Sequence, residues 1–255
     1  MPAVRPADGP GRAPVSSLEL TPDELAQALG AAELEVVGRM RYSSNATFLV
    51  EARVDGVELA AIYKPQRGER PLWDFPHGTL CRREVAAYEL SRALGWGIVP
   101  VTILRDGPLG EGAIQRFVDH DPDDHYFTLL NDHEDRFREF ACFDVLANNT
   151  DRKGGHCLHD DNDGLIVGID HGLTFHVAWK LRTVIWDFAG ERIAPRLADD
   201  VCRVVGDLDQ GALGARLREL LAPGEIEAIA ARGHALVAEG LPLPDDYHSM
   251  PWPLV

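Results

Sequence analysis

The sequence predicts an α+β fold of two lobes with a ligand cleft between them. Strand-like patterns dominate residues 18–118, helical patterns dominate residues 119–255, and the acidic connector 119–124 joins the two parts. A β-rich part and a helical part pack as separate layers, and the junction of two lobes is a common ligand site. We therefore expect an N-lobe over 18–118 and a C-lobe over 119–255. A disordered leader is expected at 1–17, which is rich in Pro, Gly and Ala.

Composition limits the classes of partner. The chain has 255 residues and a formal net charge of −16, and 45% of its residues are hydrophobic, as in ordinary globular proteins. This charge argues against nucleic-acid and anionic-membrane binding, and no run approaches the roughly 20 apolar residues of a membrane span. No CxxC pair occurs among the four cysteines, which argues against a zinc ribbon or a disulfide framework. We expect a cytoplasmic monomer without integral membrane association.

The first expected elements are a short helix and three strands. Thr21 is a typical N-cap, Pro22 suits the first helical position, and Gly30 ends the helix. The dipeptide Asp55-Gly56 predicts a two-residue hairpin turn between the last two strands. The three strand-like runs are Leu34–Met40, Thr47–Val54 and Val57–Tyr63.

The rest of the chain alternates between strands and helices. An amphipathic pattern predicts a helix over Leu80–Leu94 that ends at Gly95. Two more strands complete the first part, at Ile98–Leu104 and Ala113–Val118. In the second part we expect helices at Asp135–Leu146, Gly211–Leu221 and Gly224–Glu239. A hairpin interrupts them, with strands Cys157–His159 and Leu165–Ile169 around the turn Asp160–Gly164.

Two carboxylates flank this hairpin. Asp151 lies in a polar loop after the helix over 135–146, and Asp170 follows an apolar strand, so both can converge on one spot. Phosphoryl transfer needs such a pair, one acid to orient a hydroxyl and one to hold a metal on nucleotide phosphates. Each segment alone is also typical of a surface turn. The combination favours the functional interpretation.

Lysine is scarce in this chain and occurs only at positions 64, 153 and 180. Lys64 ends an otherwise apolar strand, where an ammonium could neutralise phosphates as a point charge. Glu84 lies on a helix about twenty residues later and could hold that ammonium in place. A solvated strand-end lysine and a solvated helix face are the simpler alternatives. The order of lysine then glutamate favours a joint role.

These residues together resemble atypical kinases. A strand lysine, a helix glutamate, Asp151-Arg152 and Ile169-Asp170-x-Gly172 are similar to the phosphatidylinositol 3-/4-kinase-like group and to HipA-type bacterial kinases. The resemblance covers about residues 34–176. It implies a two-lobe protein-kinase-like fold that binds ATP and Mg²⁺ or Mn²⁺ and transfers the γ-phosphate to a hydroxyl.

The resemblance also implies a role for each residue of the motif. Lys64 would contact phosphate and Glu84 would anchor it. Asp151 would be the catalytic acid or base, with Arg152 and Lys153 beside it in the catalytic loop. Asp170 would hold the metal ion. Segment 173–194 would be the activation or substrate loop.

Three positions depart from the family pattern. His156 stands where a second metal ligand is usually Asn, and because imidazole suits softer divalent ions we expect a preference for Mn²⁺. His171 stands where Phe is common. No glycine-rich loop is present, and the phosphate contacts would come from Ser43, Ser44 and Asn45, which could equally form an ordinary β-turn.

The kinase interpretation also places an adenine site at the end of the first part. Gln115, Phe117 and Val118 would form the hinge, whose backbone groups would bond the adenine edge. Ile62 and Phe117 would pack on the ring. The alternative is that this segment is only the last strand of the sheet.

We predict an ATP-dependent kinase that acts on a hydroxyl of a protein or small molecule. A lipid acceptor is less expected, because the net charge of −16 argues against binding an anionic lipid. Two alternatives stay open. One is a nucleotide-binding pseudokinase that acts as a scaffold. The other is a metal-dependent phosphohydrolase whose site would combine His156, His159, His171 and His176 with Asp160, Asp161 and Asp170.

Overall fold

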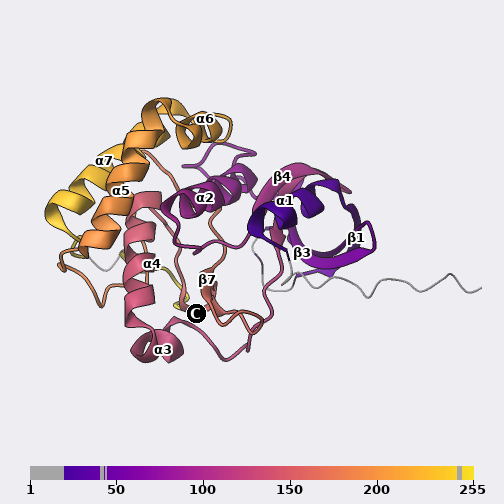
Figure 1. The fold of residues 1–255 in the computed structure, drawn as a ribbon, viewed down its shortest axis with the longest axis horizontal. Coiled ribbons are helices and arrows are strands. Elements are labelled where there is room, and N and C mark those ends of the chain that lie inside the picture. The colour runs from indigo at the N-terminus through magenta and orange to yellow at the C-terminus, as the bar shows by residue number, and fades with distance from the viewer. Residues whose placement is uncertain (1–19, 41–42, 44, 246–248) are drawn as a thin grey trace, which may run out of the picture.

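The structure is a computed structural model that describes residues 20–40, 43, 45–245 and 249–255. Figure 1 shows a sheet on one side of the molecule and a group of helices on the other. This arrangement confirms the predicted α+β fold of two parts. The leader predicted at 1–17 lies outside the described residues.

The first part is a five-stranded antiparallel sheet in the order β1-β2-β3-β5-β4. The turn Asp55-Gly56 joins β2 to β3 with positive φ at both residues, as a two-residue hairpin requires. Helix α1 (Pro22–Ala31) packs on the sheet through Leu25 and Leu29. The strands are β1 Glu33–Arg39, β2 Phe48–Val54, β3 Val57–Pro65, β4 Thr102–Gly107 and β5 Gly110–Arg116.

Strand β3 lies in the middle of the sheet, and alternation along it separates two faces. Leu59, Ala61 and Tyr63 are buried on one face. Ile62 and Lys64 therefore share the opposite face, which turns toward the helical part. The sheet thus places the predicted lysine at its inner end, where the chain leaves β3 for the loop to α2.

Two strands, β4 and β5, differ most from their predicted bounds. Strand β4 begins at Thr102 rather than Ile98, because Pro100 has no N–H for a ladder. The amides of Ile98 and Val99 instead donate to the Ser91 hydroxyl, at 2.8 and 3.1 Å. Strand β5 ends at Arg116, two residues before the predicted end, and the chain then crosses to the second part.

The second part is mainly helical. Its helices are α3 Tyr126–Leu129, α4 Glu134–Ala147, α5 Pro195–Gln210, α6 Ala212–Arg218 and α7 Pro223–Glu239. The strands β6 (Cys157–His159) and β7 (Ile166–Gly168) form the predicted hairpin, and the 3-10 turns η3 (Leu130–Asp132) and η4 (Gly154–His156) lie in this part too. The 3-10 turn η2 (Gln66–Gly68) follows β3 in the first part. Helix α5 was missed by the sequence analysis. It starts with Pro195 and buries Leu197, Val201, Val204 and Leu208.

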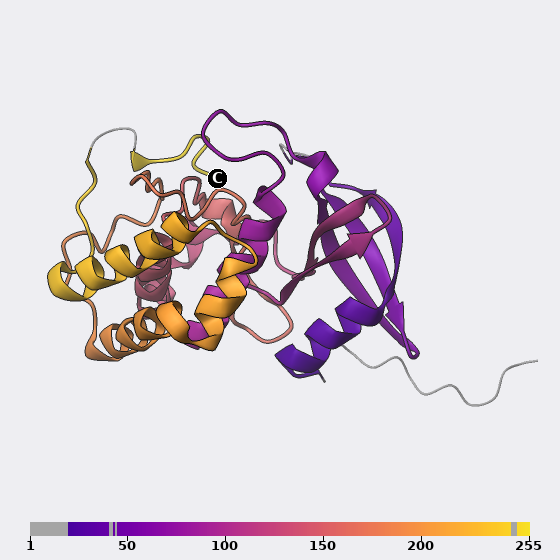
Figure 2. The same ribbon diagram turned by 90° about the horizontal axis from the view of Figure 1, so that it is seen from above.

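Helix α2 (Leu80–Leu94) packs against both parts, on β4 and β5 and on α5 and α6 (Figures 1 and 2). Arg83 on this helix is buried. It donates to the Thr174 carbonyl at 2.6 Å and pairs with Glu225 of α7 at 2.5 Å. The predicted lobe boundary at 118/119 stays a prediction, and α2 joins the two parts across it.

Arg136 of α4 also joins the two parts. Its guanidinium donates to the carbonyls of Trp96, Gly97 and Ile166, at 2.5, 3.0 and 2.9 Å. These carbonyls lie on the α2–β4 connection and on β7, so one planar donor group ties the connection to the hairpin.

Within the described residues no helix is long and apolar enough to cross a membrane.

The cysteines give a pH-dependent test of this fold. Burial raises the pKa of the Cys81, Cys142 and Cys157 thiols to about 12, whereas Cys202 is exposed. Because the thiolate is the nucleophile, the three buried thiols should stay protonated and inert at pH 8. We expect iodoacetamide at pH 8 to add one label to the native protein and four after unfolding in urea, measured by intact mass.

Cys202→Ser is the control for this labelling and should remove the single native adduct. A second adduct on the native protein at pH 8 would contradict the burial of the other three thiols.

Candidate functional site

Two adjoining cavities form a cleft between the sheet and the loops after α4 and β7. They share Ser43, Thr47, Lys64 and Asp170 among their lining residues and have volumes of about 170 and 210 Å³. Together they reach the size of small-ligand pockets, roughly 300–1,000 Å³. The polar cavity is lined further by Glu69, Glu84, Asp151, Lys153, His156 and Gly172, and the apolar cavity by Met40, Ile62, Phe117, Val118, Leu158 and Ile169.

Lys64 lies where the two cavities meet. Its Nζ is 2.6 Å from Glu84 Oε1 and 2.6 Å from Asp170 Oδ1. Burial lowers the pKa of the Lys64 ammonium, but the charges of Asp170 and Glu84 outweigh burial and hold that pKa above its ordinary value. The Lys64 ammonium in turn holds the pKa of the Asp170 carboxyl well below its usual range. Lys64 and Asp170 are therefore both charged at neutral pH.

Glu84 also fixes the backbone that follows Asp170. Its Oε2 accepts a hydrogen bond of 3.0 Å from the His171 amide. A Cβ at Gly172 would lie 3.3 Å from Glu84 Oε1, so a glycine allows this close approach. Asp170 itself has φ 59°, a conformation that non-glycine residues rarely adopt. The helix glutamate thus holds both the ammonium and the Asp170 backbone.

Asp151 lies on the opposite wall, in a loop of residues 148–156 that we call the Asp151 loop. The Asp151 amide donates to Asn149 Oδ1 at 3.0 Å, which fixes the backbone of the carboxylate. The carboxylate lines the polar cavity, and its Oδ2 is 3.0 Å from Lys153 Nζ. The structure therefore brings Asp151, Lys153 and Asp170 into one cavity.

His156 ends the Asp151 loop and faces Asp170, with Nε2 at 3.5 Å from Asp170 Oδ2. Burial lowers the pKa of His156 despite the opposing charge of Asp170, so the ring is neutral at pH 7. Its Nδ1 accepts a long hydrogen bond of 3.4 Å from the Lys153 amide. In that tautomer Nε2 carries the ring proton, and ligation through Nε2 requires the proton to move to Nδ1.

Asp170 and His156 fit a divalent ion only in part. Donor atoms that each lie about 2 Å from one ion are at most about 4 Å apart, and the separation of 3.5 Å meets this limit. Within the described residues no three His, Cys, Asp or Glu side chains form a metal-binding group. Mg²⁺ in phosphate sites commonly uses one or two protein ligands and takes the rest from phosphate oxygens and water. Asp170 and His156 match a site of this kind, in which the protein supplies only two ligands.

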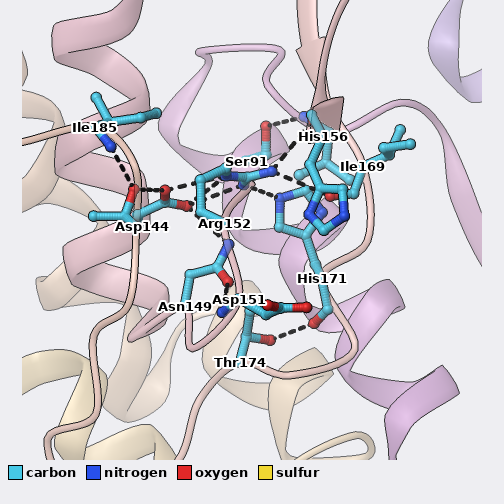
Figure 3. A network of polar contacts seen from close by, with 12 residues as sticks. Ser91, Asp144, Asn149, Asp151, Arg152, His156, Ile169, His171, Thr174 and Ile185 are labelled. Carbon is cyan, nitrogen blue, oxygen red and sulfur yellow. Dashed lines mark hydrogen bonds and ion pairs between the residues drawn. The ribbon is translucent and has the colours of Figure 1, made fainter. Parts of the chain in front are cut away.

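Below the cleft, Arg152 forms a buried network (Figure 3). Its Nη2 is 3.0 Å from Asp144 Oδ1 and 2.6 Å from His171 Nε2, and its Nη1 donates to the Ile169 carbonyl at 3.1 Å. The side chains of Arg152 and Asp144 are fully buried. Arg152 was predicted to be catalytic, but its guanidinium lines neither cavity. The structure places it as a support for the backbone on both sides of Asp170.

The residues predicted for an adenine site line the apolar cavity. Ile62 and Phe117 are half-buried and Val118 is buried there. The side-chain amide of Gln115 points elsewhere and donates to Thr102 Oγ1 at 2.9 Å. The backbone amide of Phe117 donates to the Ala60 carbonyl at 3.1 Å, so this N–H is used within the sheet.

The predicted phosphate loop is tied to the segment after β3. Ser43 Oγ lies 2.9 Å from Thr47 Oγ1, and Asn45 Oδ1 accepts from the Arg70 amide at 2.9 Å. Ser43 and Asn45 both line the polar cavity. Ser44 lies outside the described residues.

Asn148 is the main residue that sequence reasoning missed. It is fully buried. Its Nδ2 donates to the carbonyls of His176 and Ala178, at 2.9 and 2.8 Å, and its Oδ1 accepts from the Lys180 amide at 3.0 Å. One side chain thus holds the loop that follows Asp170 against the Asp151 loop. The available signal was an Asn directly after a helix, since Asn adopts the left-handed C-cap conformation readily.

The histidines of the alternative hydrolase site do not share one cavity. The His171 ring is fully buried against Arg152. His159 lies 3.7 Å from Asp124, and His176 packs on Phe75. A larger apolar hollow of about 650 Å³ between α5, α6 and α7 contains none of the predicted site residues.

The buried network predicts a large stability effect. Arg152→Ala would leave the Asp144 carboxylate buried without its cation, so we expect a loss of about 3–5 kcal/mol in the free energy of unfolding. Arg138→Ala, on the same helix as Asp144 but half-buried at the surface, should cost less than about 1 kcal/mol. Urea denaturation measures both values.

Asp144→Ala in the Arg152→Ala background separates the charge effect from lost packing. Removing the orphaned carboxylate should restore part of the lost stability. Equal stability of the Arg152→Ala and Arg138→Ala variants would contradict the buried pair.

Comparisons with known proteins agree with the fold. No protein-family model matches the chain. A crystal structure of the Helicobacter pylori proinflammatory kinase CtkA is similar with a TM-score of 0.51 and 12% identity, over 82% of this chain and 93% of that one. At this identity the similarity concerns the fold alone, and it confirms the predicted two-lobe kinase-like fold. A relation to the phosphatidylinositol 3-/4-kinase-like group or to HipA-type kinases stays a prediction.

A curated sequence relative covers almost the whole chain. Protein Rv2133c of Mycobacterium tuberculosis is 40% identical over 273 aligned positions, which include 93% of this chain and 97% of that protein. At this identity and coverage, the chain belongs to the family of Mycobacterium tuberculosis protein Rv2133c.

Proposed function

We propose that this protein is a kinase that transfers the γ-phosphate of ATP to a hydroxyl group with the help of Mg²⁺ or Mn²⁺. The observation that carries the proposal is the position of Lys64 Nζ, 2.6 Å from both Glu84 and Asp170 at the junction of the two cavities. A helix-anchored ammonium beside a carboxylate is the arrangement that positions nucleotide phosphates and their metal ion. The kinase-like fold supports the proposal.

Each cavity suits one part of the nucleotide. The apolar cavity, with Ile62, Phe117 and Val118, would pack against the adenine ring. The polar cavity would take the phosphates, with Lys64 as the point charge and with Ser43 and Asn45 as hydrogen-bonding groups of the loop above them. The Phe117 amide would not contact the adenine, because that N–H is bonded within the sheet.

The chemistry would fall to groups on the two loops. Asp151 would accept the proton of the acceptor hydroxyl, and Lys153, 3.0 Å from it, would keep the carboxylate oriented. Asp170, with His156 beside it, would hold the metal ion, which when bound neutralises charge on the phosphates. Arg152 would act indirectly by fixing the backbone at Ile169 and His171. The acceptor would be a protein or a small molecule.

Removing the proposed base tests transfer. Asp151→Asn should lower transfer from γ-labelled ATP by about 100-fold or more and leave ATP binding intact, because Lys64 does not depend on Asp151. Lys64→Ala should lose both binding and transfer. Asp161→Asn, an exposed carboxylate on the β6–β7 turn, is the matched control and should transfer as the wild type does.

The same experiment separates the two alternatives. A pseudokinase would bind metal-supported ATP but transfer no faster than Asp151→Asn. A hydrolase would release phosphate from a non-nucleotide ester and would be insensitive to Lys64→Ala. Either result would reject the proposed transfer activity.

The metal preference tests His156. Wild-type protein should bind ATP more tightly with Mn²⁺ than with Mg²⁺, and His156→Asn should shift the ratio of the two affinities toward Mg²⁺ by about tenfold, because an amide oxygen suits Mg²⁺ better than an imidazole does. Isothermal titration with each metal measures the ratio. His159→Asn, on the neighbouring strand, is the control. An unchanged ratio in His156→Asn would show that His156 is a hydrogen-bond partner of Asp170 and not a ligand.

A further inference from the structure

Residues 249–255, which we call the strap, run alongside the Asp151 loop, although the two segments are far apart in the sequence. The Ser249 carbonyl accepts from the Thr183 amide at 3.0 Å and from the Trp186 indole at 3.1 Å. Ser249 and Pro251 are buried. In Figure 1 the end of the strap, marked C, lies near α3, and both Leu254 and Phe127 of α3 lie close to Gly154. The strap is thus anchored at one end and reaches the Asp151 loop at the other.

The contact with the Asp151 loop is made at Gly154. The Gly154 amide donates to the Leu254 carbonyl at 2.7 Å. A Cβ at Gly154 would lie 3.0 Å from the Phe127 ring and 3.3 Å from the Leu254 oxygen, so a larger residue would push these groups away. At Gly155 a Cβ would meet Val255 at 3.5 Å, an ordinary contact. The glycine requirement is therefore specific to position 154.

Gly154 begins the 3-10 turn η4, which presents two of the cleft side chains. Lys153 precedes it and reaches Asp151, and His156 ends it. The His156 amide donates to the Lys153 carbonyl at 3.1 Å, and the Lys153 amide donates to the His156 ring at 3.4 Å. On the far side, the His156 carbonyl accepts from the Ile169 amide at 3.0 Å. The hairpin holds one end of the turn and the strap holds the other.

The strap contributes to this contact mainly through its backbone. The Met250 and Trp252 side chains are 50% and 86% exposed, so they add little to the core. A segment kept for core packing would bury such side chains. The strap is held instead by the buried Ser249 and Pro251 and by the carbonyls of Ser249 and Leu254.

We propose that the strap is a positioning element of the Asp151 loop. The Leu254 carbonyl and the Phe127 ring clamp Gly154, and this clamp keeps Lys153 at Asp151 and His156 at Asp170. Its catalytic consequence rests on the proposed kinase function, whereas the ordering of the turn does not. Positioning matters because a misplacement of about 1 Å can cost about 100-fold in rate.

Deletion of residues 250–255 tests the ordering directly. Hydrogen–deuterium exchange of the peptide spanning 152–158 should become at least about tenfold faster, because the Gly154 amide loses its acceptor. Exchange across α4 and β3 should stay unchanged, as should the thermal unfolding midpoint. Unchanged exchange at 152–158 would overturn the proposal.

A matched pair of glycine variants tests the clamp in the full chain. Gly154→Ala should speed exchange of the same peptide, whereas Gly155→Ala should behave as the wild type. Phe127→Ala combined with Gly154→Ala should slow the exchange again, because it removes the closest atoms to the new Cβ. Rescue by truncating a second side chain is not expected of a merely destabilised protein. Equal exchange in the two single variants would overturn the clamp at Gly154.

Transfer assays on the same variants add the functional consequence. The deletion and Gly154→Ala should lower kcat about tenfold and raise KM for ATP by a smaller factor, because the strap positions Lys153 and His156 but does not touch Lys64 and Glu84. Faster exchange with unchanged kcat would overturn the positioning role. A wild-type protein without any transfer would instead reject the proposed function, and the exchange results would still decide the ordering of the turn.

Discussion

The ion pairs of Lys64 determine how the two parts of the molecule meet at the cleft. The side chain is only 15% exposed, and a buried cation is tolerated only with charged or hydrogen-bonding partners. Its partners come from different places, Glu84 from helix α2 and Asp170 from the loop after β7. The desolvation of such groups offsets most of their attraction, so these pairs add little net stability. Their effect is geometric, because one ammonium sets the positions of a strand, a helix and a loop.

A second network supports the first from below. Glu84 holds the His171 amide, the His171 ring contacts Arg152, and Arg152 pairs with Asp144 on α4 (Figure 3). Asp170 lies between these contacts with its positive φ of 59°. Unfavourable backbone conformations persist where the surroundings fix them from several sides. The two networks therefore explain how a carboxylate can be held in this conformation at the junction of the cavities.

The sequence could predict those features that depend on local patterns. Asp55-Gly56 predicts its hairpin, because few dipeptides readily adopt positive φ at both positions of the turn. The end of an apolar strand and the start of a polar loop place Lys64 and Asp170 near one cleft, and a two-lobe fold brings them together. The order of a strand lysine and a helix glutamate about twenty residues later related Glu84 to Lys64.

The features that the sequence could not predict depend on distant partners. Arg152 stands among polar residues, which usually indicate exposure, and its burial follows only from Asp144 on the preceding helix. Helix α5 is an exception, because Leu197, Val201, Val204 and Leu208 follow helical spacing after Pro195, so a local pattern indicated this helix although it was not predicted. The requirement for glycine at 154 arises from Phe127 and Leu254, which no local pattern connects to it.

The use of lysine at position 64 and arginine at the other buried sites follows from the geometry of the two cations. Arg83 and Arg152 are almost completely buried and fill their planar donor forks with carboxylates and carbonyls, which suits a structural joint. The Lys64 ammonium is compact and has three N–H donors, of which Glu84 and Asp170 take two. An ammonium between two carboxylates therefore keeps a donor for a ligand in the cleft. A guanidinium in the same place would extend farther and fill the space that the phosphates of the proposed nucleotide need.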